Sequence, residues 1–230
     1  MNTQFFKTTI AGVLFAVLSL NALAADEVRI DGAEVGRWTM DFEAAVKKAV
    51  EKKLPLMLNF TGSDWCGWCK LMDEQIFAQD VWNEFAKENV FLVTIDFPED
   101  KSIVPEKYAA RNDKLREEFE VRGYPTYIVL DSDGKTKLGQ LGAGRDKTPA
   151  SFVEEFKNVV RLSESNIEAY VKANPEKAEA FMAAIAEDRA AKKDFADWLA
   201  TKPVRNEENT RKFEAFQTRL KEAAEELTAF

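Results

Sequence analysis

The pattern of apolar and polar positions near the start of the chain predicts a short strand followed by an amphipathic helix. Residues 35–41 have an alternating character, which is typical of a half-buried strand. Residues 41–53 then follow a helical period, and Asp41 stands where a side chain can cap the first turn. One apolar stripe of this helix is expected to face the core. It consists of Phe42, Ala45, Val46, Ala49 and Val50.

Two continuous apolar runs, residues 56–60 and 90–96, have the length and composition of strands that are buried on both faces. Between them we expect a loop and a helical region that ends near residue 89 and carries the only two cysteines of the chain. A second helix is expected over residues 105–119.

The pattern then changes to two short strands around an Asp-Gly turn, which predicts a hairpin over residues 126–130 and 136–141. An amphipathic helix over residues 149–162 follows. Because strands alternate with helices along the chain, we expect an α/β fold. Its central sheet should be mostly parallel, with an antiparallel hairpin at one edge and helices on both sides.

Residues 163–230 differ in character, because they contain no glycine and no strand-like run. Pro175 and Pro203 divide them into three helical segments. The last segment carries apolar residues at alternating steps of three and four, which forms a seam. These residues are Phe213, Phe216, Leu220, Ala223 and Leu227. The seam could pack on a neighbouring helix of the same chain or on a second copy, so we expect a monomer or a homodimer through this tail.

The first residues have the pattern of a removable export signal. Lys7 supplies a positive charge, an apolar run of eleven residues follows, and Ala22-Leu23-Ala24 is a small-x-small cleavage site. We therefore divide the chain into a signal peptide (1–24), an α/β domain (25–162) and a helical extension (163–230). Cleavage after Ala24 would make the protein periplasmic or otherwise exported; an uncleaved membrane anchor is the alternative.

The composition excludes several classes of function. A net charge of −8 argues against nucleic acid as a partner. The absence of histidine excludes histidine acid–base catalysis and the Cys–His and Ser–His nucleophile pairs. Two cysteines cannot complete a four-ligand zinc site, so we expect no metal and no cofactor.

Cys66 and Cys69 form a Cys-Gly-Trp-Cys motif. In an exported protein the simplest interpretation is a structural disulfide, but a bridge across so short a loop restricts the unfolded chain little. The position after a strand and a loop, at the first turn of a helix, favours a redox role, because backbone N–H groups and the helix dipole stabilise a thiolate on Cys66. We expect an exposed attacking sulfur on Cys66 and a buried resolving sulfur on Cys69.

The neighbours of the cysteines fit this role. Lys70, one turn after Cys66, adds positive charge that would lower the pKa of its thiol, and Gly67 lets a partner chain approach closely. Trp65 and Trp68 flank the motif. Either could fill the core, but we expect Trp68 to be exposed.

The Trp-Cys-Gly-Trp-Cys-Lys run after a buried strand, with Gly-Tyr-Pro-Thr before the hairpin, resembles the thioredoxin superfamily. In particular it resembles exported bacterial thioredoxin-like proteins of the disulfide reductase and isomerase type, over residues 35–162. The resemblance implies a thioredoxin-like fold, a central mixed sheet flanked by helices, here with an all-α C-terminal extension. It makes Cys66 the nucleophile and Cys69 the resolving thiol.

The resemblance also implies a substrate surface around the cysteine pair. Pro125 would be a cis-proline that faces the pair, and Tyr124 before it would offer backbone hydrogen bonds to an extended substrate. The other substrate-binding residues would be Trp65, Gly67, Trp68 and Thr126.

One departure from thioredoxins affects proton transfer. Thioredoxins bury an aspartate on the strand before the motif, where it helps to deprotonate the resolving cysteine, and pair it with a lysine. The matching positions here are Asn59 and, approximately, Leu92. Losing both charges is physically coherent, because either one alone would be costly to bury. Proton transfer at Cys69 must then use water or another carboxylate, and the nearest in sequence are Asp64, Asp73 and Glu74.

The leading hypothesis is an exported thiol–disulfide oxidoreductase that reduces or isomerises disulfides of other exported proteins. A membrane-bound thiol donor would keep its cysteines reduced. The aromatic residue between the cysteines resembles exported isomerases and favours reduction or isomerisation over oxidation. The alternative is a redox-inactive binding module, with a permanent Cys66–Cys69 disulfide and a helical tail that grips a partner or a second copy.

Overall fold

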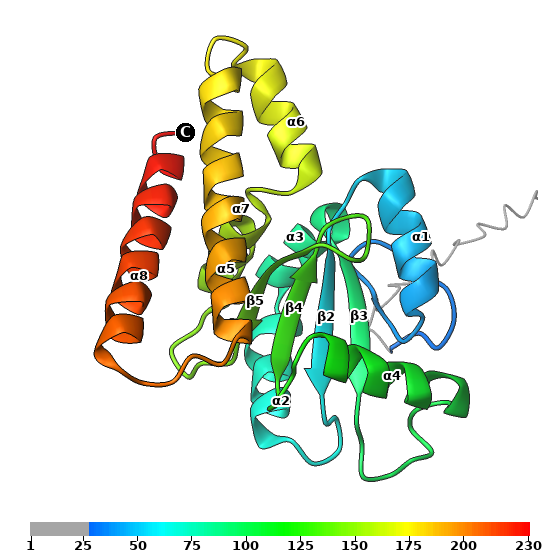
Figure 1. The fold of residues 1–230 in the computed structure, drawn as a ribbon. Coiled ribbons are helices and arrows are strands. Elements are labelled where there is room, and N and C mark those ends of the chain that lie inside the picture. The colour runs from blue at the N-terminus through cyan, green and yellow to red at the C-terminus, as the bar shows by residue number, and fades with distance from the viewer. Residues whose placement is uncertain (1–27) are drawn as a thin grey trace, which may run out of the picture.

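A computed structural model describes residues 28–230, and the expected export signal lies outside them (Figure 1). A single sheet of five strands lies between helices, and further helices follow it. The strands are β1 (Trp38–Thr39), β2 (Leu56–Thr61), β3 (Phe91–Asp96), β4 (Thr126–Leu130) and β5 (Lys137–Gly142). The helices are α1 (Phe42–Lys52), α2 (Gly67–Met72), the π-helix η1 (Asp73–Phe77), α3 (Asp80–Asn89), α4 (Glu106–Glu118), α5 (Pro149–Val160), α6 (Glu164–Ala173), α7 (Ala178–Ala200) and α8 (Glu207–Leu227).

The strand order of the sheet is β1-β3-β2-β4-β5. β2 and β1 pair parallel to β3, whereas β4 pairs antiparallel to both β2 and β5. The sheet is therefore mixed, as expected, and the predicted β4–β5 hairpin forms one edge of it, next to the central strand β2. This topology brings the carboxyl ends of β2 and β3 to the same edge as the amino end of β4.

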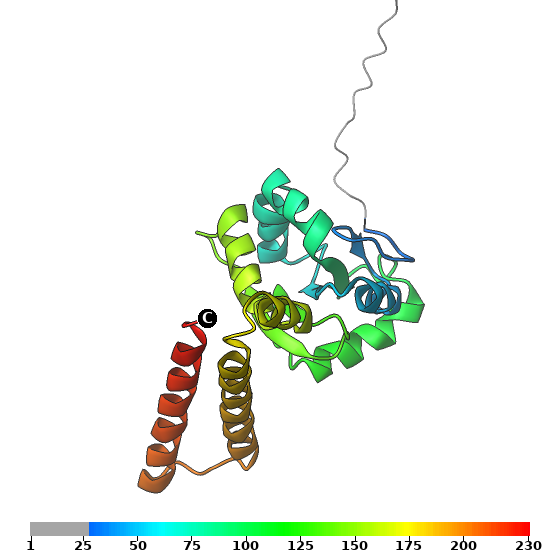
Figure 2. The same ribbon diagram turned by 90° about the horizontal axis from the view of Figure 1, so that it is seen from above.

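Each face of the sheet carries its own core. α2, η1, α3 and α5 cover one face, where Phe77, Trp82 and Phe152 pack edge to face. α1 and α4 cover the other face, where Leu58 and Ile128 are buried. Figure 2 shows the two helical layers from above. β2 and β3 are buried along their whole length, as their apolar runs predict.

The strand predicted at residues 35–41 and the stripe of α1 need correction. Only Trp38 and Thr39 form a strand, and Val35 makes a single isolated bridge to Phe91, because Gly36 takes a positive φ of 73° that interrupts the extended run. Asp41 does cap α1, accepting a hydrogen bond from Ala44 N–H. Val50 is 56% exposed, because α1 rests on the sheet through Ala45 and Ala49 and the next position turns to solvent.

The helical region between β2 and β3 is interrupted. After α2 the chain widens into η1, and Gln79 is extended before α3 begins at Asp80. In this π-helical turn the adjacent residues Ile76 and Phe77 are both buried. Because η1 separates α2 from α3, Ile76 and Phe77 can both fill the core below the cysteines, which a continuous amphipathic helix would not allow.

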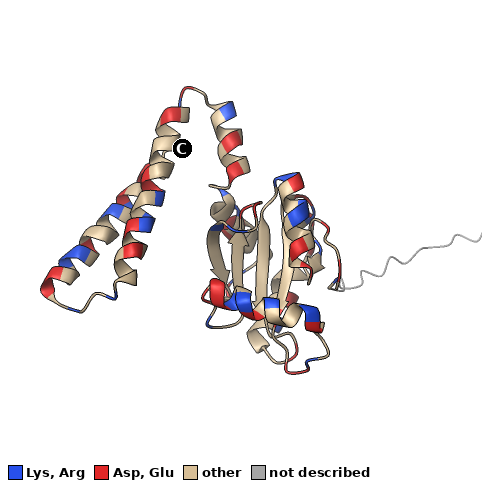
Figure 3. Ribbon diagram, turned by 45° about the vertical axis from the view of Figure 1, so that its right-hand side comes forward, with Lys and Arg blue, Asp and Glu red and all other residues tan. Residues whose placement is uncertain are grey.

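The tail forms three helices, as predicted. α6 lies against the sheet domain, where the Asp131 carboxylate accepts a hydrogen bond from Glu164 N–H at 2.8 Å. α7 and α8 lie side by side and project away from the sheet (Figures 2 and 3). The seam of α8 packs on α7 of the same chain, so Ala223 and Leu227 are buried.

Charged residues are sparse in the strands, where Asp96 ends β3 and Lys137 begins β5, and are interspersed along the outer helices, including both helices of the α7–α8 hairpin (Figure 3). Within residues 28–230, no helix has the length and apolar character that crossing a membrane requires.

Candidate active site

The cysteine pair lies where β2 ends and α2 begins. Cys66 is the N-cap of α2, with extended backbone angles, and Gly67 is the first helical residue. Cys66 and Cys69 form a disulfide, with their Cα atoms 5.2 Å apart. Cys69 N–H donates to Cys66 Sγ at 3.2 Å. The first turn of the helix therefore directs a backbone donor at the sulfur that the sequence assigns as nucleophile.

Both cysteines are buried, at 5% exposure for Cys66 and 2% for Cys69. The expectation of an exposed sulfur on Cys66 is therefore wrong for this disulfide form. The reason is that the bond to Cys69 and the contact with its N–H hold the Cys66 sulfur against the first turn of the helix.

The loop before Cys66 is tied to the loop after β3. Ser63 donates to the buried Asp96 carboxylate from its backbone N–H at 2.9 Å and from its hydroxyl at 2.6 Å. The Asp64 carboxylate accepts hydrogen bonds from Glu99 and Asp100 N–H, and these bonds, Asp100's first, lower its pKa. Sequence reasoning missed Asp96 as a loop anchor, because its partner is distant in sequence.

Lys70 contributes to the same loop. Its ammonium donates to the Asp64 carbonyl at 2.6 Å, two residues before Cys66. The Lys70 ammonium therefore binds the backbone of the loop that leads to Cys66.

An aromatic wall borders the cysteine pair. Trp65 donates from Nε1 to Phe97 carbonyl at 2.9 Å, and its ring meets Tyr124 edge to face at 5.7 Å. A Cβ at Gly62 would lie 2.3 Å from the Trp65 ring, so only glycine permits this packing. Trp65 and Trp68 are 44% and 43% exposed, which confirms the expectation for Trp68.

The Gly-Tyr-Pro-Thr segment lies at the same edge of the sheet. The Tyr124–Pro125 peptide bond is cis, and Pro125 is buried. Thr126 begins β4 opposite Phe60 of β2, and its hydroxyl donates to Gly123 carbonyl at 2.8 Å. The structure thus brings Trp65 and Tyr124 into contact, whereas the Thr126 side chain stabilises its own turn.

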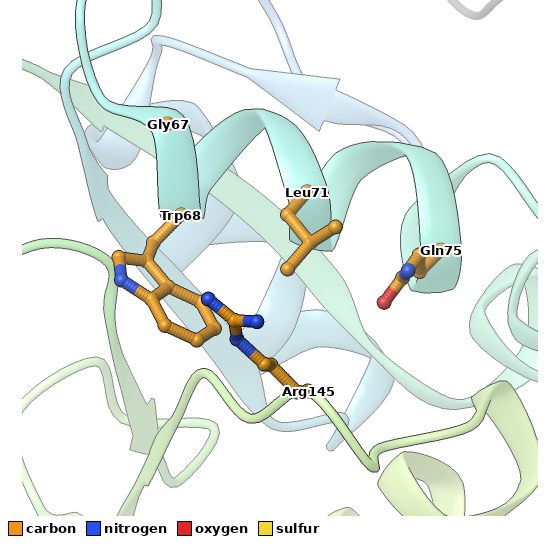
Figure 4. A pocket seen from close by; sticks show the side chains of 5 residues that line it. All are labelled: Gly67, Trp68, Leu71, Gln75 and Arg145. Atoms are coloured by element: carbon orange, nitrogen blue, oxygen red, sulfur yellow. The ribbon is translucent and has the colours of Figure 1, made fainter.

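Trp68 lines a pocket of about 580 Å³ beside the motif (Figure 4). Its other lining residues are Gly67, Leu71, Gln75 and Arg145. Arg145 lies in the loop between β5 and α5, and no local motif signals its place next to the cysteine helix.

The α/β domain that carries the cysteine pair is similar to known proteins. A sequence profile of the thioredoxin-like domain matches residues 42–157. The chain belongs to the thioredoxin-like family. It is 31% identical over 121 residues to the disulfide bond reductase DsbH of Chlamydia pneumoniae, which covers 53% of this chain and 71% of that protein. It is 24% identical over 151 residues to the thioredoxin-related protein DsbJ of the same organism, across 66% of this chain and 42% of that relative.

A solved structure of a DsbH oxidoreductase also matches this fold. Its TM-score is 0.51 at 30% sequence identity, and the match covers 57% of this chain and 88% of that structure. The thioredoxin-like fold, the relatives and the Cys66–Cys69 disulfide together identify the chain as a thiol–disulfide oxidoreductase.

Within this thioredoxin-like domain, the sheet below the cysteine helix carries buried polar side chains without charge. Asn59 stands opposite Thr94 on β3 and Tyr127 on β4, and Leu92 stands opposite Met57. Asn59 Oδ1, Thr61 Oγ1 and Tyr127 OH are buried and have no hydrogen-bond partner among residues 28–230. No basic residue is therefore in register with Asn59, which agrees with its lack of charge.

Asp73 is the carboxylic acid with the most altered pKa near this site. It lies one helical turn after Cys69, and its backbone N–H donates to Cys69 carbonyl. Desolvation, together with the nearby negative charges of Asp96 and Glu74, raises the pKa of Asp73 to about 6. The residue still contacts solvent, which will moderate this shift.

Proposed function

We propose that this oxidoreductase acts outside the cytosol and reduces or isomerises disulfides of other exported proteins through Cys66 and Cys69. The observation that carries the proposal is the cysteine pair at the start of α2, with a backbone N–H directed at Cys66 Sγ. The name of the relative DsbH, a disulfide bond reductase, favours reduction as the direction. The pattern of residues 1–24 supports export.

The reduced protein would act by two exchange steps. The Cys66 thiolate attacks one sulfur of a substrate disulfide, and the other substrate sulfur leaves as a thiolate. Cys69 then loses its proton and attacks Cys66 Sγ, which forms the intramolecular disulfide and releases the second substrate thiolate. Two electrons pass to the substrate, whose two thiolates take up two protons: the one that Cys69 releases and one from solvent, which received the proton of the Cys66 thiol when its thiolate formed. A membrane-bound dithiol donor would reverse the exchange and restore the pair.

We propose that Asp73 accepts the proton of Cys69. Its position one turn along the helix and its raised pKa make it a stronger base than an ordinary carboxylate. Asp64 is less suited, because two backbone N–H groups occupy its carboxylate and lower its pKa. Asn59 would tune the pair as a neutral neighbour, and Lys70 would add positive charge near Cys66.

The proposed substrate surface consists of the exposed rings and the open backbone around the pair. Trp65 and Tyr124 form its wall on one side, and Trp68 borders the other. The backbone of Tyr124 would pair with an extended substrate segment beside Pro125. Thr126 would act indirectly, by holding the turn through its bond to Gly123.

The experiment is disulfide reduction with two cysteine variants. We expect Cys66→Ser to abolish reduction of insulin by the pre-reduced full-length protein, because the attacking sulfur is lost. Cys69→Ala should retain attack but fail to resolve, so substrates accumulate as mixed disulfides on Cys66 that migrate as larger species on non-reducing gels. Undiminished reduction by Cys66→Ser would refute the proposal.

The alternative, a binding module with a permanent disulfide, has one observation in its favour. Apolar side chains are exposed at the far end of the α7–α8 hairpin, including Leu199, Val204 and Phe213. On this view, mild dithiol reductant would leave the Cys66–Cys69 bond closed while partner capture depended on the hairpin. Thiol titration after such treatment separates the two functions, because the redox proposal requires both thiols to appear.

We propose that the boundary between the α/β domain and the helical extension lies at residue 162.

A further inference from the structure

A pocket lies beside Trp68, next to the cysteine pair. It runs along one side of α2 and η1, from Gly67 next to the nucleophile to Gln75, and the β5–α5 loop closes it from the other side (Figure 4). Its volume of about 580 Å³ is in the range of small-ligand pockets. A Cβ added at Gly67 would meet no atom within 4 Å, so the space above that residue is open.

The lining combines apolar surface with one cation. Trp68 and Leu71 provide the apolar wall, Gln75 provides an amide, and Arg145 is the single charged residue of the five. The Arg145 guanidinium carbon lies 5.5 Å from the centre of the Trp68 ring, within the range of a cation–π contact. That contact positions the guanidinium over the mouth of the pocket.

The hydrogen-bond donors of Arg145 are available to a ligand. Among the ion pairs of residues 28–230, none involves Arg145. A guanidinium pairs best with a carboxylate, which it can meet with two parallel hydrogen bonds. The chain as a whole has a net charge of −8 and repels acidic partners, so any attraction to a carboxylate must be local.

We propose that this pocket is a substrate subsite that selects an aspartate or glutamate close to the substrate's reactive cysteine. The inference rests on the proposed function, because the substrate sulfur must reach Cys66. Gly67 to Gln75 spans roughly 12 Å at the rise of a helix, which three or four residues of extended peptide would match. Arg145 lies at Trp68, the end near Cys66, so the acidic residue belongs about two positions from the substrate cysteine.

The test uses synthetic peptides that differ in one residue. Each peptide carries a single cysteine in a mixed disulfide with 2-mercaptoethanol. A Glu, Gln or Lys lies two positions from that cysteine. In one series this residue comes before the cysteine, and in the other series it comes after it. Pre-reduced full-length protein supplies both electrons in a single turnover, and the second-order rate of thiol release is measured. In at least one series we expect Glu to react about fivefold faster than Gln, and Lys to react slowest.

Variants assign this preference to Arg145. Arg145→Gln should reduce the Glu-to-Gln ratio to about one, whereas Arg145→Lys should keep part of it, since an ammonium attracts a carboxylate without the bidentate geometry. Arg189→Gln, which removes the same charge from the distant helix α7, should keep the full ratio.

Three outcomes would overturn the subsite. The first is equal rates for the Glu and Gln peptides with the unmodified protein. The second is an unchanged Glu-to-Gln rate ratio in Arg145→Gln. The third is a uniform loss of rate for all peptides in that variant, which would mean that Arg145 only supports Trp68. These differ from failure of the proposed function, in which the unmodified protein would reduce none of the peptides.

Discussion

At the scale of single residues, the chemistry of the site depends on how each side chain is solvated. Cys66 and Cys69 are recognisable from their spacing, but their burial depends on the disulfide that joins them. Asp73 looks like a surface residue in the sequence. The charge of Asp96, which ends strand β3, lies near Asp73 in the fold and helps to raise the pKa of Asp73.

We predict that Asp73 makes stability depend on pH. Its pKa rises from 3.8 in the unfolded chain to about 6 in the folded protein, so the stabilisation it provides when protonated is lost as pH rises through that window. Asp73→Asn stays neutral and avoids this loss. Its gain in the free energy of unfolding should be about 1 kcal/mol larger at pH 7 than at pH 4, a value reduced from the full shift because solvent screens the exposed carboxylate.

Urea unfolding at several pH values measures this gain. Glu74→Gln is the matched control, because it removes a neighbouring charge that contributes to the shift but leaves Asp73 able to titrate. Glu74→Gln should narrow the pH range over which the free energy of unfolding falls, without abolishing that fall. A difference between Asp73→Asn and the unmodified protein that is the same at every pH would contradict the prediction.

At the scale of elements, the connection between the sheet domain and the helical extension rests on a helix cap. Asp131 follows β4 and is buried, and its carboxylate accepts hydrogen bonds from Ser132 N–H and, at the start of α6, from Glu164 N–H. Ser163 caps the same helix and accepts from Asn166 N–H. An acidic group at a helix N-terminus adds to this stabilisation through the helix dipole.

We predict that Asp131→Ala lowers the free energy of unfolding by about 2 kcal/mol, because it removes two hydrogen bonds to a charged acceptor at a buried position. The control is Glu168→Ala, which removes the exposed ion pair between Glu168 of α6 and Lys53, the residue that follows α1. That change should cost about 0.5 kcal/mol or less, since exposed pairs are screened by water. Denaturant unfolding compares the two variants, and equal losses would mean that the buried cap does not hold the extension.

At the scale of the whole molecule, the α7–α8 hairpin is the least supported part. A cluster around Ile167, Phe181 and Leu227 packs its base, close to α6. Farther along, Phe195, Trp198 and Phe216 contact one another across the two helices but remain partly exposed. Two helices alone cannot enclose a seam of aromatic residues, so its outer side stays in water.

We predict that a protein of residues 25–230 is a monomer at micromolar concentration, because α7 already covers the buried part of the α8 seam. Sedimentation velocity over a range of concentrations checks this. A dimer that dissociates in Phe213→Glu would contradict it and assign the exposed end of the hairpin to a contact between copies. Phe213 is the suitable position, because it is exposed and makes ring contacts only within the hairpin.

Most elements could be predicted from local pattern. β2, β3 and β4 are mostly apolar and buried throughout, and α5 and the three tail helices follow their predicted segments. The failures arise where a distant contact overrides a local pattern. Gly36 turns the chain out of the predicted first strand against the backbone of Lys87 on α3, and Val50 belongs to an apolar stripe that the sheet covers only in part.

By itself, the sequence determined the thioredoxin-like order of strands and helices and the position of Cys66 and Cys69 at the start of a helix, because periodicity, capping and motif spacing are local properties. Only the tertiary structure decided that Trp65 meets Tyr124 and that Arg145 faces Trp68. It also decided that the seam of α8 packs on α7 of the same chain. These contacts join residues far apart in sequence, and the packing of the sheet and its loops, rather than any local preference, brings them together.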